Sequence, residues 1–159
     1  MLVPPLVHGL ILALVIGIVA GLRAMLAPAA VAWAATRGAL PLQGTWLAFL
    51  GWRFTPWILT LLAATELVTD QLPSTPSRKV PPQFIARLLS GGLSGAAVGY
   101  AVGLPLQGIV LGVVGAVIGI YGGAATRTRL AIAFGNDRPA ALIEDAVAIL
   151  GAVLVVSSL

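Results

Sequence analysis

The feature that most constrains the fold of this chain is a set of glycines at helical spacing in two adjacent apolar segments. In each segment a glycine recurs every fourth residue. Each glycine costs a helix about 1 kcal/mol relative to alanine, so such helices need a compensating interaction. In a bilayer, small residues let two helix backbones approach closely and pack. We therefore predict a transmembrane hairpin over residues 83–126 that is held by a glycine zipper. Its packing residues are Gly91, Gly95, Gly99, Gly103, Gly115, Gly119 and Gly123.

The ends of this hairpin are also suggested by the sequence. Residues 104–107, Leu-Pro-Leu-Gln, would form its tight turn, and Arg127 and Arg129 would end its second helix. Arg87 follows the start of the first helix by about one turn, and we expect its long side chain to reach back to the membrane surface.

The composition places the whole chain in the membrane. Hydrophobic residues make up 59% of its 159 positions and charged residues only 9%. We predict one all-α transmembrane domain over residues 1–159, a helix bundle of about five membrane segments, within a range of about four to six. Val-Pro-Pro at residues 3–5 recurs at residues 80–82, which suggests a weak internal repeat of residues 3–79 and 80–159 in inverted orientation.

Several classes of site are excluded or disfavoured by residue content. The net charge of +4 comes from scattered basic residues, which fit topology signals beside lipid headgroups better than a nucleic-acid surface. The chain has no cysteine and one histidine, so disulfides and cysteine-based metal sites are excluded. No phosphate-loop, dinucleotide or metal-ligand motif is present, and we expect no cofactor and no bound metal. Candidate nucleophiles and bases are few, and we do not expect an enzyme.

The first apolar segment is too long for one straight crossing and is interrupted by Arg23 and Pro28. Two arrangements are open. One long helix could tilt and kink at Pro28, or residues 5–22 could span the membrane and residues 24–35 return as a short half-helix.

The connections predict an orientation. Residues 37–53 contain Trp46 and Trp52 and suit a loop at the headgroup level. Residues 71–82 and 126–138 are separated by two spans, so we expect these two loops to share one side. Most of the basic residues lie near these loops, and we assign that side to the cytoplasm.

Four of the five acidic residues lie inside apolar helical stretches. Glu66 and Asp70 are four residues apart on one helix face, with Thr65 and Thr69 beside them. Glu144 and Asp145 are adjacent on the last helix, so their side chains diverge by about 100°. A carboxylate in hydrocarbon costs a few kcal/mol, so it needs a cation, a bound ion or a proton. Arg23 is the internal cation that the sequence offers.

Two interpretations of these charges are open. In the first, the acids neutralise arginines and fix the packing of the spans. In the second, they line a path for an ion or small solute, together with the two threonines and Arg23 as counter-ion. The residues of this predicted path are Glu66, Asp70, Glu144, Asp145, Arg23, Thr65 and Thr69.

Three stretches resemble a family of multi-pass bacterial membrane proteins that is classified only as a domain of unknown function. They are Gly-Leu-Arg-Ala at residues 21–24, Glu-Leu-Val-Thr-Asp-Gln-Leu-Pro at residues 66–73, and Leu-Ile-Glu-Asp-Ala at residues 142–146. The family's pattern Glu-x-x-x-Asp-x-x-Pro and its C-terminal Glu-Asp pair match here. Residue 71 is Gln, whereas the family often has lysine at that position. The resemblance implies a location in the bacterial inner membrane. It gives no information on an activity.

Together these features predict a small transporter or channel. Its substrate would be a cation, a small cationic solute, or a solute whose transport is coupled to protons. The alternative is a non-transporting membrane scaffold or accessory subunit with structural ion pairs. In both cases we expect a homodimer that is formed through one of the glycine faces.

Overall fold

The computed structural model describes residues 5–71 and 80–159, which form an all-α fold. Within these residues there are six α-helices and one short 3₁₀ helix, and no strand. The elements are α1 (Pro5–Leu22), α2 (Leu26–Thr36), η1 (Ala48–Gly51), α3 (Thr55–Thr69), α4 (Pro81–Ala101), α5 (Pro105–Phe134) and α6 (Asp137–Ser157).

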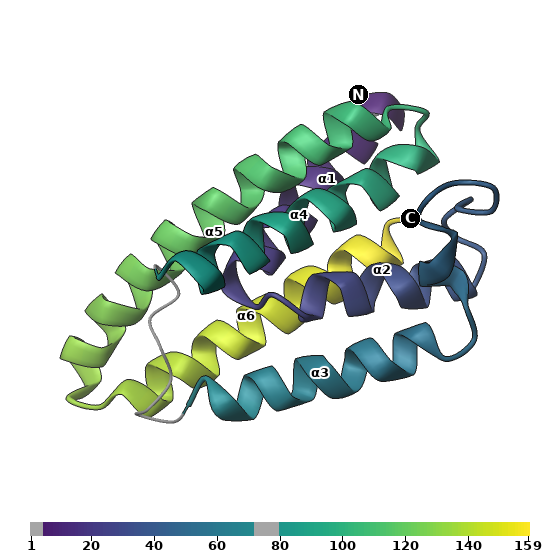
Figure 1. The fold of residues 1–159 in the computed structure, drawn as a ribbon. Helices are drawn as coiled ribbons and strands as arrows, with labels where there is room; N and C mark the ends of the chain where they lie inside the picture. Colours follow the sequence, from purple (N-terminus) through teal and green to yellow (C-terminus); the bar gives the residue numbers. More distant parts are fainter. Residues whose placement is uncertain (1–4, 72–79) are drawn as a thin grey trace.

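The helices form an elongated bundle (Figure 1). The two marked chain ends and the α4–α5 turn lie at one end of it, and the α5–α6 connection lies at the other. The last turn of α3 and the first turn of α4 lie toward the same end as the α5–α6 connection. Most of the predicted loop at residues 71–82 lies outside the described residues, so the side that it shares with residues 126–138 stays a prediction.

The tightest packing joins α1, α4 and α5, and glycines make it possible. A Cβ placed on Gly91, Gly95 or Gly99 would lie under 3.0 Å from backbone atoms of α5 or of the residue before it. Gly17 and Gly21 of α1 meet the backbone of α5 in the same way, and Gly115 and Gly119 meet α1. Real Cβ atoms do not approach backbone so closely, so these contacts exist only because the residues lack a side chain. Five of the seven predicted packing glycines lie in these contacts.

The other two predicted packing glycines have different positions. Gly103 lies beyond the end of α4, with a φ of 71° and no atom within 4 Å of the place where a Cβ would lie, so its assignment to the packing face was wrong. A positive φ favours glycine, and Gly103 allows the tight turn. Gly123 lies on α5 and lines a small cavity beside α6.

The hairpin is longer than predicted at both ends. The turn of the hairpin is formed by residues 102–104. Pro105 is already the first residue of α5, where the N–H that proline lacks would need no partner. Arg127 and Arg129 do not end the second helix, which continues to Phe134. Gly135, with a φ of 65°, and Asn136 form the whole connection to α6, and the Asn136 side chain accepts a hydrogen bond from the Arg138 backbone N–H. Residues 126–138, which were predicted to form a loop, are therefore mostly helical.

The first apolar segment breaks at Arg23 and not at Pro28. α1 ends at Leu22, α2 begins at Leu26, and Figure 1 shows α2 leaving at a sharp angle to α1. Pro28 lies in the first turn of α2, where the lack of a backbone N–H costs no helical hydrogen bond. The arrangement with a helix over residues 5–22 followed by a short second helix is the one observed.

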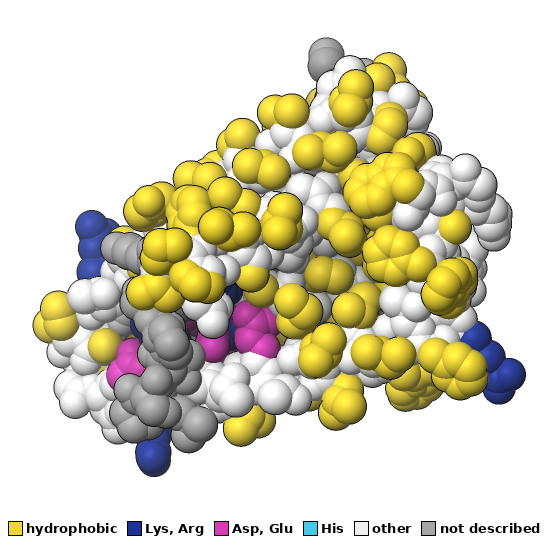
Figure 2. Space-filling model, viewed as in Figure 1, with side chains coloured by type: hydrophobic (Ala, Val, Ile, Leu, Met, Phe, Trp, Pro, Cys, Tyr) yellow, Lys and Arg dark blue, Asp and Glu magenta, His cyan; other side chains and the backbone are white. Residues whose placement is uncertain are grey.

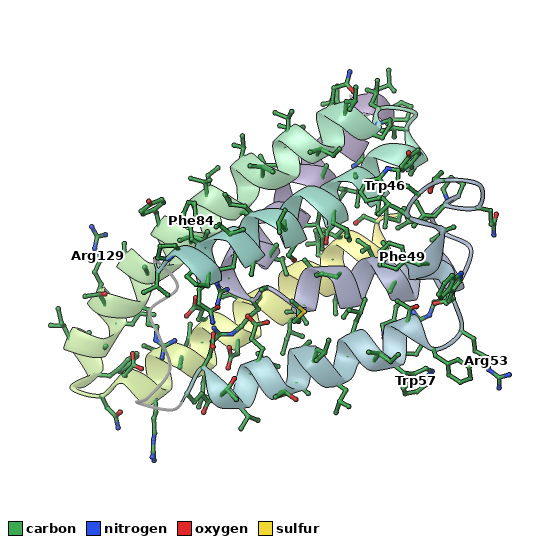
Figure 3. The ribbon with its side chains drawn as sticks, viewed as in Figure 1. Trp46, Phe49, Arg53, Trp57, Phe84 and Arg129 are labelled. Atoms are coloured by element: carbon green, nitrogen blue, oxygen red, sulfur yellow. The ribbon has the colours of Figure 1, made fainter. Side chains whose placement is uncertain are left out.

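The segment between α2 and α3 closes one end of the bundle. Leu40, Leu42, Leu47 and Leu50 are buried and belong to the same apolar core as α1 and α2. Trp46, Trp52 and Trp57 are exposed, and Figure 3 shows aromatic side chains at this end of the molecule, with Arg129 near the opposite end.

Three helices are long and apolar enough to cross a membrane: α1, α5 and α6. α5 has 30 residues and is about 45 Å long at 1.5 Å per residue. Large apolar side chains on α5 and α6, such as Val110, Ile118 and Leu150, are exposed. These surfaces are consistent with contact to lipid, and the three helices fit a membrane protein.

We predict that Gly112→Ala lowers the free energy of unfolding by about 1–3 kcal/mol, because the added methyl group meets the backbone of Gly91 and Gly95. The measurement is thermal unfolding in detergent, followed by tryptophan fluorescence. The control is Gly122→Ala on the same helix, where the new methyl group meets nothing within 4 Å. This control should unfold at the wild-type temperature or slightly above it. Equal effects of the two variants would contradict the role given to the glycine contacts.

Candidate functional site

The break between α1 and α2 exposes backbone groups in the interior of the bundle. The last carbonyls of α1 and the first N–H groups of α2 have no partner within their own helices. Gly21 packs against Ala116 and Gly119, near the middle of α5, so the break lies about halfway along the longest helix. Unpaired backbone groups at this depth in hydrocarbon would cost several kcal/mol each.

Glu66 pairs with two backbone N–H groups in the turn directly before α2. Its two carboxylate oxygens accept hydrogen bonds from the backbone N–H of Ala24 and of Met25, each at 2.7 Å. The positive end of the α2 dipole points at this carboxylate, which adds an attractive electrostatic term. Glu66 therefore caps a helix that precedes it by about forty residues in the sequence.

Arg87 satisfies the carbonyls at the end of α1. Its Nη1 donates to the carbonyl oxygens of Leu22 at 2.6 Å and Gly21 at 3.2 Å. Its Nη2 lies 3.4 Å from a carboxylate oxygen of Glu66 and 3.4 Å from one of Asp70. The Ser90 hydroxyl, one turn further along α4, donates to the carbonyl oxygen of Ala24. The prediction that Arg87 reaches back to the surface was wrong, since the side chain is only 2% exposed.

Arg23, inside the break, bridges two acids from different helices. Its Nη1 lies 2.6 Å from Asp70 Oδ2 on α3, while its Nε lies 2.6 Å and its Nη2 2.5 Å from Asp145 Oδ1 on α6. The Arg23 side chain is completely buried, and Gln71 donates to the other oxygen of Asp145 at 3.3 Å. The two predicted acid pairs therefore do meet at one depth, with Arg23 between them.

A second group of charges joins α5 to the start of α6. Arg127 lies 2.5 Å from Asp137 and 3.6 Å from the buried Glu144. Glu144 thus faces Arg127 while its neighbour Asp145 faces Arg23, as expected from the 100° between adjacent side chains. A cavity of about 140 Å³ lies beside Arg127 and Glu144.

The structure does not bring every predicted path residue into the cluster. Thr65 lies on an exposed face of α3 and donates to the Leu61 carbonyl of its own helix. Thr69 is exposed as well, and its hydroxyl donates to the Glu66 carbonyl oxygen at 3.3 Å. The acids and Arg23 are brought together, and Arg87, Ser90 and Arg127 join them.

The position of Arg87 was wrongly predicted from the sequence. The residues that follow Arg87 do indicate that its side chain lies in the interior. Ser90, Gly91 and Ser94 follow it by three, four and seven residues, so they share one helix face with it. A face of small residues packs inward, and an arginine on that face is carried inward with them. Arg127 was assigned to a loop because the length of α5 was underestimated.

All five acidic side chains of the chain contact a guanidinium group of Arg23, Arg87 or Arg127. The side chains of Glu66, Asp70 and Asp145 are 13%, 14% and 10% exposed. Figure 2 shows acidic side chains at the surface between α3 and α4, next to apolar ones.

No metal site is found in the part of the chain that the structure describes, where no group of three His, Asp or Glu side chains could hold an ion. Comparisons with protein-family models, with curated proteins and with solved structures give no match. The function has to be inferred from the geometry of the cluster.

We predict that Arg23 and Asp145 are energetically coupled. Arg23→Gln should destabilise the protein by about 3–5 kcal/mol, because Asp145 is left nearly buried without its guanidinium partner. Adding Asp145→Asn should cost about 1–3 kcal/mol less than the sum of the two single effects. The measurement is a double-mutant cycle of denaturant unfolding in detergent. Arg53→Gln, outside the cluster and beside Phe54, should be additive with Asp145→Asn. Coupling of the same size in both cycles would refute the pairing.

Proposed function

We propose that this chain is a multi-pass membrane scaffold or accessory subunit that does not transport a solute, and that its buried charges hold a broken helix in the membrane. The observation that carries this proposal is the partnering of each acid at the break. Glu66 accepts two backbone N–H groups, and Asp70 and Asp145 share Arg23. Carboxylates engaged in this way stabilise the fold and are not free to bind a travelling ion.

The break itself gives this role a physical reason. A helix interrupted inside hydrocarbon requires donors and acceptors for its free ends, and Glu66 and Arg87 supply both. α3 packs chiefly against α2 and η1, so the carboxylates of Glu66 and Asp70 also tie α3 to the rest of the bundle.

Transport of a cation, a proton or a cationic solute is the second candidate. The specific observation in its favour is the partial exposure of Glu66, Asp70 and Asp145. Discontinuous helices with charged residues at the break are also typical of secondary transporters. In this case these carboxylates would handle the proton or cation, and Arg23 would act as the counter-ion.

Several finer features belong to the same proposal. We infer about five membrane segments, which are the broken α1–α2 pair, α3, α4, α5 and α6. We interpret the α4–α5 pair as a glycine zipper, and we place the loops at residues 71–82 and 126–138 in the cytoplasm of a bacterial cell, with the chain in the inner membrane. The resemblance of three stretches to the uncharacterised membrane family is the argument for this location, and it gives no information on an activity.

The homodimer remains a prediction, with one physical restriction. The glycines of α1, α4 and α5 are used in contacts within the chain. A dimer would therefore have to use another surface, such as the exposed apolar face of α3 or α6.

The two functions predict opposite effects of Glu66→Gln. In the scaffold, the substitution lowers the free energy of unfolding by about 2 kcal/mol, because an amide cannot accept both N–H groups of α2. In liposomes that contain a pH-sensitive dye, the wild type then shows no proton or cation flux above protein-free vesicles. In a transporter, the wild type conducts, and Glu66→Gln changes the flux while the melting temperature stays near that of the wild type.

Thr65→Val is the matched control for this test, since Thr65 precedes Glu66 and its hydroxyl bonds to its own helix on an exposed face. It should leave both stability and flux unchanged. Wild-type flux that depends on Glu66, together with unchanged stability of the Gln variant, would falsify the scaffold role.

A further inference from the structure

A groove lies on the side of the bundle between α2, α3 and α6, away from the charge cluster. Its volume is about 460 Å³, within the range of roughly 300–1,000 Å³ that is usual for small-molecule sites. Most of its lining is apolar: Leu26, Ala29, Ala30, Ala63, Ile149 and Val153. α2 packs against both α3 and α6, while α3 and α6 make little direct contact, so α2 forms the floor of the groove.

One end of the groove is polar. Arg37 and Ser157 line it there, near the last residues of α2 and α6. The Arg37 guanidinium lies 5.5 Å from the ring centre of Trp33, and the Trp33 indole N–H donates to the Thr60 hydroxyl at 3.0 Å. Each of these side chains also lines the groove.

Arg37 differs from the arginines of the charge cluster. Arg23, Arg87 and Arg127 each contact carboxylates, whereas the side chain of Arg37 lies over the Trp33 ring and forms no ion pair with a described residue. Every aspartate and glutamate of the chain is already engaged in the cluster. The guanidinium at the polar end of the groove is therefore a cation without an anionic partner among the described residues.

The surroundings of the groove match those of a lipid. α6 is one of the three helices that could cross a membrane, and its Leu150 and Leu154, which follow groove residues in the sequence, are exposed. Trp57 is exposed and contacts the Trp33 ring, over which the Arg37 guanidinium lies, and tryptophan and arginine are usual at the level of the headgroups. An apolar cavity that ends in a cation at this level has the charge and polarity of a site for one phospholipid.

We propose that this groove binds one anionic phospholipid, with an acyl chain against α2 and α6 and the headgroup phosphate on Arg37. A guanidinium group holds a phosphate through two parallel N–H···O bonds, and its face remains stacked on Trp33. The proposal depends on the chain lying in a bilayer. It does not depend on the choice between scaffold and transporter, and its test measures no flux.

The test is native mass spectrometry of the full chain in detergent, titrated with phosphatidylglycerol or with phosphatidylcholine of the same acyl chains. We expect one tightly retained phosphatidylglycerol per chain and weaker retention of phosphatidylcholine. Arg37→Gln should weaken phosphatidylglycerol binding about tenfold, to the level of phosphatidylcholine, because a charged hydrogen bond is lost. Arg53→Gln is the matched control, since Arg53 also stacks on an aromatic ring but does not line the groove. It should bind as the wild type does.

A second pair of variants tests the apolar part of the site. Ala30→Leu fills the groove and should weaken the binding of both lipids at least fivefold, whereas Ala124→Leu, on α5 and outside the groove, should not. Thermal unfolding of each variant verifies that it is folded. Equal retention of the two lipids by the wild type would indicate bulk lipid only and would overturn the proposal. Unchanged lipid binding in both Arg37→Gln and Ala30→Leu would also overturn the proposal. A dimer that excludes lipid from the groove would overturn it as well.

Discussion

The structure depends on how the free backbone groups at the α1–α2 break are paired in the interior of the bundle. A helix can end inside hydrocarbon only if its last carbonyls and the first N–H groups of the next helix find partners. Here the partners are charged: Arg87 for the carbonyls of α1 and Glu66 for the N–H groups of α2. Each charge faces the helix end of opposite sign, so the two helix dipoles offset part of the cost of burying these ions.

The charges at the break then organise the helices around it. Arg23 joins Asp70 of α3 to Asp145 of α6, and Arg87 brings α4 against the end of α1. α3 has few buried side chains of its own, so its attachment relies on α2 and on its two carboxylates. The cluster therefore acts as a tertiary contact among four helices, and removal of one member leaves an uncompensated charge in a nearly dry site.

The glycine contacts allow this arrangement. Because α1, α4 and α5 approach to backbone distance, Gly21 and the break lie directly against the middle of α5, and Arg87 is brought within reach of the carbonyls of Gly21 and Leu22. Larger residues on these faces would move α4 outward, and the guanidinium of Arg87 would lose the carbonyls. Dispersion contacts and ion pairing are thus linked through the distance between the helices.

The sequence by itself determined the all-α class, the long apolar helices, a break in the first segment near Arg23 or Pro28, and the close packing of most of the glycines. These properties follow from composition and from helical periodicity, which are local. The sequence did not determine the length of α5, because an arginine can lie inside a helix as well as after it. The sequence also did not determine the turn at Gly103. Only the tertiary structure decided which acid pairs with which arginine, and that Glu66 caps α2. These partners are tens of residues apart, and their contact depends on the packing of four helices, which no local pattern encodes.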